Sequence, residues 1–87
     1  AYALEIPGDS MEPVFRNGDT VIFSPQANIR RGDRVVVKTK NGEVMVKLLQ
    51  RQSVHKIELK SLNPDHEDRS LEVENVEWIA RVIGSSH

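Results

Sequence analysis

The chain has 87 residues, which suit one domain with a modest core, because a chain this short buries only about 60–65% of its unfolded surface. Its 12 Lys and Arg side chains nearly balance 13 Asp and Glu, giving a formal net charge of −1, so no basic surface marks this piece as a nucleic-acid binder. The absence of cysteine excludes disulfides, thiolate metal sites and a cysteine nucleophile, and fits a cytoplasmic location.

Apolar runs in the sequence are short. None approaches the roughly 20 residues that span a bilayer, and no basic-then-apolar signal opens the chain. We therefore predict a soluble protein with no membrane partner. The start at Ala1 rather than at methionine leads us to expect a processed or truncated chain that a further domain precedes.

The first third of the chain contains two predicted strands separated by a turn. Residues 3–6 form a short strand, which the following Pro-Gly pair ends because proline lacks the amide that a ladder needs. Residues 11–16 are predicted to form one short helical turn, closed by an Asn-Gly pair. The β-branched and aromatic residues 20–23 indicate the next strand, and residues 26–32 a loop.

A hairpin is the clearest structural signal in the sequence. Residues 34–39 and 43–49 are both rich in valine and other strand-forming residues. The intervening Asn41-Gly42 pair is the residue combination that two-residue hairpin turns prefer. These two strands are expected to pair antiparallel.

The second half of the chain also favours strands. Residues 55–62 alternate between apolar and charged side chains, which predicts a half-exposed strand. Residues 65–70 are polar and are expected to form a solvated loop, followed by strands at 71–73 and 76–83. Residues 84–87 are expected to be a tail.

The predicted fold class is mainly β. We expect a small single domain over residues 1–84, built of short antiparallel strands with a β-hairpin and one short helical turn, and a tail at residues 85–87. The sequence has no internal repeat and no helix long enough to read DNA.

The turn at residues 8–13, Gly-Asp-Ser-Met-Glu-Pro, presents the candidate nucleophile, Ser10. A serine hydroxyl needs a base within hydrogen-bond reach and backbone amides directed at the developing oxyanion. Gly8 permits close approach of the backbone, and amides at the start of a helical turn are unpaired. We therefore expect the amides of Asp9 and Ser10 to bind the oxyanion.

Lys47 is the candidate base. In the run Glu-Val-Met-Val-Lys-Leu-Leu, it is the one charged residue with apolar neighbours on both sides, and it shares a strand face with Met45 and Leu49. Burial disfavours an ammonium and lowers the pKa of a lysine, which is the condition for it to accept a proton.

Simpler explanations exist for each of these residues. Ser10 and Asp9 are also ordinary helix caps, and a lysine in an amphipathic strand commonly extends its amine to water. His66 lies among acidic residues, a pattern that could indicate a metal site or a Ser-His-Asp triad. We interpret the segment as a solvated acidic loop, because it has no apolar residues to hold such a site in a fixed geometry. We expect no metal and no cofactor.

The sequence resembles the catalytic domain of LexA-like repressors and their phage relatives along almost its whole length. The matching segments are Gly-Asp-Ser-Met-Glu-Pro at 8–13, Asn-Gly-Asp at 17–19, Arg-Gly-Asp at 31–33 before Val-Val-Val, Val-Lys-Leu-Leu at 46–49, Ser-Leu-Asn-Pro at 61–64 and Ile-Ala-Arg-Val-Ile-Gly at 79–84. The spacing from Ser10 to Lys47 is also similar to that of the family's catalytic dyad.

This resemblance implies a self-cleaving serine peptidase and dimerisation domain, with Ser10 as nucleophile and Lys47 as general base. In such repressors a helix-turn-helix domain binds operator DNA, and the serine cuts the linker between the two domains, usually after a small residue in an Ala-Gly or Cys-Gly pair. Neither pair occurs in this chain. The family further implies a homodimer and an SOS response in which the RecA filament promotes cleavage.

Two rival functions remain open at this point. Signal peptidases also use Ser-Met-x-Pro and a lysine, but they carry a membrane anchor and a later Gly-Asp-Asn segment that this chain lacks. A non-catalytic dimerisation module is the other rival, in which residues 76–83 pair with a second copy through Trp78, Ala80 and Val82.

Overall fold

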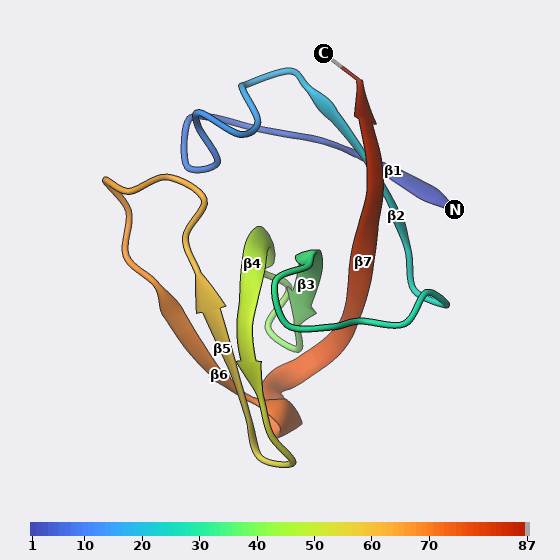
Figure 1. The fold of residues 1–87 in the computed structure, drawn as a ribbon, viewed down its shortest axis with the longest axis vertical. Helices are drawn as coiled ribbons and strands as arrows, with labels where there is room; N and C mark the ends of the chain where they lie inside the picture. Colours follow the sequence, from blue (N-terminus) through green and yellow to red (C-terminus); the bar gives the residue numbers. More distant parts are fainter. Residues whose placement is uncertain (87) are drawn as a thin grey trace.

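The computed structural model describes residues 1–86 and consists almost entirely of strands (Figure 1). The elements in chain order are β1 (Tyr2–Glu5), β2 (Thr20–Ser24), β3 (Arg34–Thr39), β4 (Val44–Gln52), β5 (Lys56–Lys60), β6 (Arg69–Glu72), the 3-10 helix η1 (Val73–Asn75) and β7 (Val76–Ser86). The mainly β fold class is thus confirmed.

The strands form one antiparallel sheet in the order β1-β2-β7-β3-β4-β5-β6. Consecutive strands from β3 to β6 are neighbours, as expected where connections are short. The last strand, β7, lies between β2 and β3 and joins the N-terminal pair to the rest of the sheet (Figure 1).

Two apolar clusters fill the two faces of this sheet. The first contains side chains of the N-terminal segment packed on the central strands: Ile6, Met11, Phe15, Val21, Phe23, Val36, Val46 and Ala80. The second contains Val35, Val37, Met45, Leu49, Ile57 and Leu59. Successive strand residues face opposite sides, so the Val35–Val37 run contributes to both clusters.

The predicted pairing of the hairpin strands is confirmed: Val37 pairs with Met45 and Lys38 with Val44. The turn differs from the predicted two-residue type, because the Thr39 N–H donates to the Glu43 carbonyl and leaves residues 40–42 as the loop. Gly42 has a φ of 91°, a left-handed value that glycine adopts without steric cost.

The predicted helical turn at residues 11–16 is shorter than expected. It contains one helical hydrogen bond, in which the Phe15 N–H donates to the Met11 carbonyl at 2.8 Å. Within the described residues the Asp9 side chain accepts no amide of the turn, so the predicted cap is not formed; instead the Asp9 backbone carbonyl accepts from the Glu12 N–H at 3.0 Å. The Glu12–Pro13 peptide bond is cis.

The C-terminal boundaries also differ from expectation. Residues 84–86, predicted as tail, continue β7 and pair with β2, where Gly84 lies opposite Ile22 and Ser86 opposite Thr20. Strand pairing joins backbone groups and does not need apolar side chains. The polar side chains of residues 84–86 therefore gave no sign that the strand continues. His87 lies outside the described residues. The predicted loop at 65–70 ends early because β6 begins at Arg69.

Within residues 1–86, no helix has both the length and the apolar content needed to cross a bilayer.

Truncating a buried side chain tests the packing of the second cluster. Leu59 is fully buried on β5, so Leu59→Ala should lower the free energy of unfolding by about 2–5 kcal/mol, through lost burial and the cavity left behind. Urea denaturation followed by circular dichroism measures this change. Val54→Ala is the control, because Val54 is 84% exposed and its truncation should change stability by less than about 0.5 kcal/mol. Equal losses in both variants would contradict the assigned core.

Candidate active site

Backbone hydrogen bonds define the turn that carries Ser10. Gly8 has a φ of 75°, and its N–H donates to Asn17 Oδ1 at 2.8 Å. The Glu12 N–H to Asp9 carbonyl bond closes a four-residue turn with Ser10 at its second position. The hydroxyl is therefore presented at a tight bend held at both ends.

The Ser10 hydroxyl donates to the Met11 sulfur, with 2.8 Å between Oγ and Sδ. A thioether sulfur is a weak acceptor, so this bond is easily exchanged for a stronger one. Ser10 is half-buried, whereas Met11 is buried in the first cluster. Met11 therefore anchors the turn while the hydroxyl stays near the surface.

Three successive amides of the turn have no acceptor. Within residues 1–86, no hydrogen bond is donated by the N–H groups of Asp9, Ser10 or Met11. Asp9 and Ser10 were expected from the sequence to offer such amides. Met11 was missed, because the sequence does not show where the turn's first internal bond forms.

Lys47 lies on β4 and is buried, with only 8% of its surface exposed. Burial lowers the pKa of the Lys47 amine, and the positive charge of Arg69 lowers it further. The carboxylates of Asp68 and Glu43 act in the opposite direction but are the smaller effects. Within the described chain, the amine makes no hydrogen bond or ion pair.

A bidentate ion pair holds the arginine that influences Lys47. Arg69 donates from Nη1 and Nη2 to the two carboxylate oxygens of Glu43, at 2.9 and 3.1 Å. This contact lowers the pKa of Glu43 and raises that of Arg69. The fork geometry fixes the guanidinium in place, which a single contact would not do.

The loop of residues 61–68, between β5 and β6, begins beside Lys47 and contacts the turn of Ser10. Leu48 pairs with Lys60, so the register places Lys47 level with Ser61 at the start of this loop. The Ser61 N–H donates to Asp68 Oδ1 at 2.8 Å, and its hydroxyl donates to the Asn63 carbonyl at 2.9 Å.

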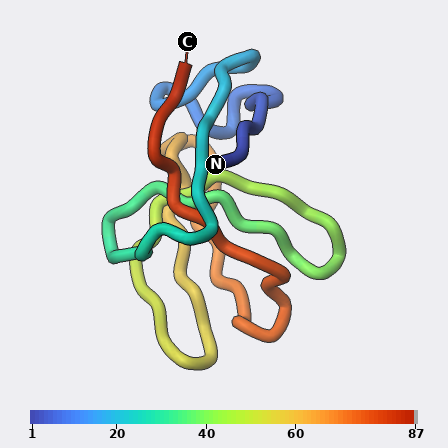
Figure 2. Tube along the Cα trace, turned by 90° about the vertical axis from the view of Figure 1, so that its right-hand side faces the viewer, coloured from blue at the N-terminus to red at the C-terminus, as the bar shows by residue number. Residues whose placement is uncertain are grey.

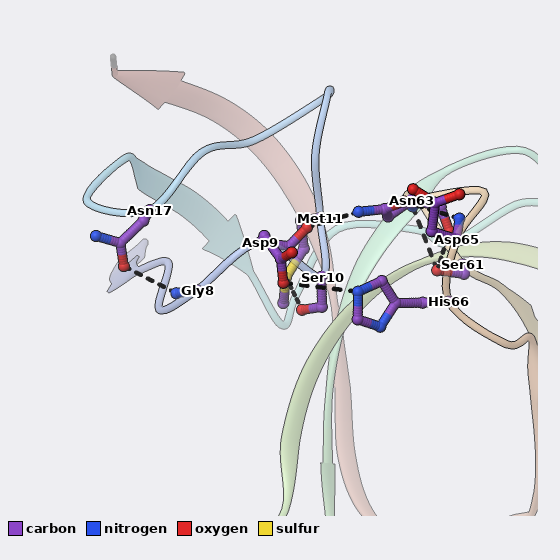
Figure 3. A network of polar contacts seen from close by, with 9 residues as sticks. All are labelled: Gly8, Asp9, Ser10, Met11, Asn17, Ser61, Asn63, Asp65 and His66. Atoms are coloured by element: carbon purple, nitrogen blue, oxygen red, sulfur yellow. Dashed lines mark hydrogen bonds and ion pairs between the residues drawn. The ribbon is translucent and has the colours of Figure 1, made fainter.

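Asn63 completes the connection (Figure 3). Its Nδ2 donates to the Asp9 carbonyl at 2.8 Å across 54 positions of sequence. Figures 1 and 2 place residues 8–18 and this loop at the same end of the molecule. Within residues 1–86 no hydrogen bond joins Ser10 to Lys47: the Ser10 hydroxyl donates to Met11, and strand alternation puts Lys47 on the face of Met45 and Leu49.

His66 is part of the same loop and is exposed, as the solvated-loop interpretation predicts. Its Nε2 lies 3.6 Å from Asp9 Oδ1 (Figure 3). No group of three His, Cys, Asp or Glu side chains within residues 1–86 is arranged to hold a metal ion.

The residues predicted for a dimer interface lie on β7 but differ in exposure. Ala80 is fully buried in the first cluster, so its side chain cannot contribute to a surface. Trp78 and Val82 are partly buried against the same cluster, and Trp78 stacks on Phe23 with ring centroids 5.5 Å apart. The alternating face of β7 that carries these three residues is turned inward.

The lowered pKa of Lys47 predicts a pH-dependent cost to stability. The folded state binds fewer protons than the unfolded state between the lowered pKa and the ordinary value near 10.5, so stability rises with pH across that interval. Lys47→Met should therefore stabilise the domain at neutral pH, with a gain that shrinks as pH approaches 10. Thermal unfolding at pH 7 to 10 measures this, and Lys40→Met, at an exposed position, should show no such trend. A gain that stays constant with pH would contradict the buried amine.

The sequence is similar to a known protein family and to a known relative. Residues 1–83 match the family described as Peptidase S24-like. Over 70 residues, covering 77% of this chain, the sequence is 43% identical to an uncharacterized HTH-type transcriptional regulator of Coxiella burnetii. The chain spans about a third, 31%, of that regulator's length. The chain therefore belongs to the Peptidase S24-like family, to which the catalytic domains of LexA-like and phage repressors also belong.

Proposed function

We propose that this domain is the self-cleaving serine peptidase of a transcriptional repressor, with Ser10 as nucleophile and Lys47 as general base. The observation that carries the proposal is Lys47, a buried residue whose amine has a lowered pKa and makes no hydrogen bond or ion pair within the described chain. It lies level with the loop that Asn63 ties to the turn of Ser10. A lysine with a lowered pKa is a candidate base, which favours a functional reason for its presence.

The reaction requires two proton transfers by the lysine. Neutral Lys47 accepts the Ser10 proton as Oγ leaves Met11 Sδ and attacks the carbonyl carbon of a linker peptide bond. The tetrahedral oxyanion is bound by the unpaired amides of the turn. Collapse breaks the C–N bond, and Lys47 returns the proton to the leaving amine. Water, deprotonated by the same lysine, then hydrolyses the acyl-enzyme.

The substrate and partners follow from the same proposal. The substrate is the protein's own linker, and operator DNA is bound by a separate domain, in keeping with the helix-turn-helix type of the Coxiella burnetii relative. Because the reaction depends on bringing a base, a hydroxyl and a linker together, a partner such as the RecA filament acts by stabilising that conformation.

Self-cleavage of the full-length protein tests the proposed dyad. Ser10→Ala and Lys47→Ala should each lower the first-order cleavage rate by about 10⁴-fold or more, because each removes a group that acts in every turnover. The wild-type rate should rise with pH through the lowered pKa of Lys47 and then level off. Gel electrophoresis of timed samples measures both effects.

The control in this experiment is Lys38→Ala, which removes a half-exposed lysine of the neighbouring strand that pairs with Glu77 at 3.7 Å. It should cleave like the wild type. A folded Ser10→Ala or Lys47→Ala protein that still cuts itself would remove that residue from the mechanism.

We also propose that the domain forms a homodimer through exposed apolar side chains of β2 and β7. Ile22 and Ile83 are 36% and 52% exposed on these paired strands, and Ile83 lies at the register shift between the pairs Ile22–Gly84 and Phe23–Val82. Exposed isoleucines favour contact with another apolar surface, and a two-fold axis would bring this face against its own copy.

Charge on this face should therefore disrupt the dimer. Ile83→Asp should raise the dissociation constant by at least about tenfold, since it places a carboxylate in an apolar contact. Light scattering after size-exclusion chromatography measures the mass. Val54→Asp is the matched control, because Val54 is 84% exposed on the hairpin between β4 and β5. An Ile83→Asp protein that stays dimeric would reject this face.

A further inference from the structure

Asn63 is a buried polar residue beside the turn, with 7% of its surface exposed. Its oxygen accepts the N–H of Asp65 at 2.8 Å, while its nitrogen reaches the Asp9 carbonyl. The Ser61 hydroxyl contacts both the carbonyl and the N–H of Asn63, at 2.9 and 3.2 Å. Contacts within its own loop thus fix the orientation of the Asn63 side-chain amide, independently of its contact with the turn.

The Asp9 carbonyl is the group that Asn63 holds. It accepts two hydrogen bonds, one from Glu12 N–H within the turn and one from Asn63 Nδ2 across the molecule. A carbonyl oxygen has two lone pairs, so both of its acceptor positions are occupied. Rotation of this carbonyl would break both bonds.

The same peptide unit contains the Ser10 N–H. A trans peptide is planar and its carbonyl and N–H point in opposite directions, and the Asp9–Ser10 bond is not among the cis bonds of the chain. Fixing the Asp9 carbonyl toward Asn63 therefore turns the Ser10 N–H away from that loop. This N–H has no acceptor within the described residues.

We infer that Asn63 is a positioning residue for the oxyanion site: its side-chain amide holds the Asp9 carbonyl and thereby orients the Ser10 N–H toward the carbonyl under attack. The inference rests on the proposed peptidase function. It assigns the loop after β5 a role in catalysis, whereas the imidazole of His66, in the same loop, lies beside the Asp9 side chain rather than its carbonyl.

Alternative roles for Asn63 predict different behaviour. A residue that only stabilises the fold would change the unfolding temperature and leave the rate of the folded protein unchanged. A residue that acts on Lys47 would shift the midpoint of the pH–rate profile. A residue that orients the oxyanion donor lowers the plateau rate and leaves the midpoint in place, because the base is untouched.

Asn63→Asp is the sharpest test, made in the full-length protein. The carboxylate has the shape of the amide and still accepts the Asp65 N–H, but it cannot donate to the Asp9 carbonyl. The plateau of the cleavage rate should fall by about tenfold to a hundredfold, less than the loss on deleting an oxyanion donor outright. The pH midpoint is compared in Asn63→Ser, which adds no charge to the loop beside Lys47, and there it should not move.

Two further variants complete the experiment. His66→Ala removes the neighbouring contact to Asp9 and should cleave within about twofold of the wild type. Asn63→Ser replaces Asn63→Asp if the latter fails to fold, because a serine hydroxyl still accepts from the backbone two residues on and is too short to reach Asp9. Wild-type cleavage by a folded Asn63 variant, or equal slowing by His66→Ala, overturns the inference.

A spectroscopic readout separates this inference from the proposed function. The backbone amide resonance of Ser10 should shift in Asn63→Asp and much less in His66→Ala, whether or not the protein cleaves itself. Absence of cleavage in the wild type, with the expected shift of the Ser10 resonance, would reject the peptidase and keep the positioning contact. An unchanged Ser10 resonance in Asn63→Asp rejects the contact.

Discussion

The desolvated amine of Lys47 is the constraint on which the rest of the site depends. Its strand lies between β3 and β5, so neighbouring backbones flank it on both sides and little of the side chain reaches water. Removing an ammonium from water disfavours its charged form, and this desolvation is the largest influence on the pKa of Lys47. The proposed base therefore stands at the position where the strand's surroundings most oppose a charge.

The sheet explains how the N-terminal segment reaches the central strands. Because β7 closes the gap between β2 and β3, the N-terminal segment lies over the face that contains Val36 and Val46. Met11 packs into this cluster next to Ser10, whereas Lys47 follows Val46 on its strand and shares the opposite face with Met45 and Leu49 of the second cluster. The proposed nucleophile and the proposed base thus adjoin different apolar clusters, and Asn63 ties the loop beside Lys47 to the turn.

Local patterns predicted much of this arrangement. The Asn41-Gly42 hairpin, the doubly buried valines and the enclosed Lys47 each depend on residues close in sequence, so periodicity and turn chemistry were sufficient to find them. The pairing of β7 with β2 and the contact between Asn63 and Asp9 join segments more than 50 residues apart. No local preference encodes such pairings, and the polar end of β7 gave no side-chain signal at all.

The charges around Lys47 are arranged so that desolvation prevails. Glu43 would favour the ammonium, but Arg69 binds both of its carboxylate oxygens and adds a positive charge of its own. Asp68 also favours the ammonium, yet one of its oxygens accepts the N–H of Ser61. Each of these two carboxylates therefore already accepts a hydrogen bond from another donor, which weakens its stabilisation of the protonated Lys47 amine. Burial remains the largest influence on the pKa of that amine.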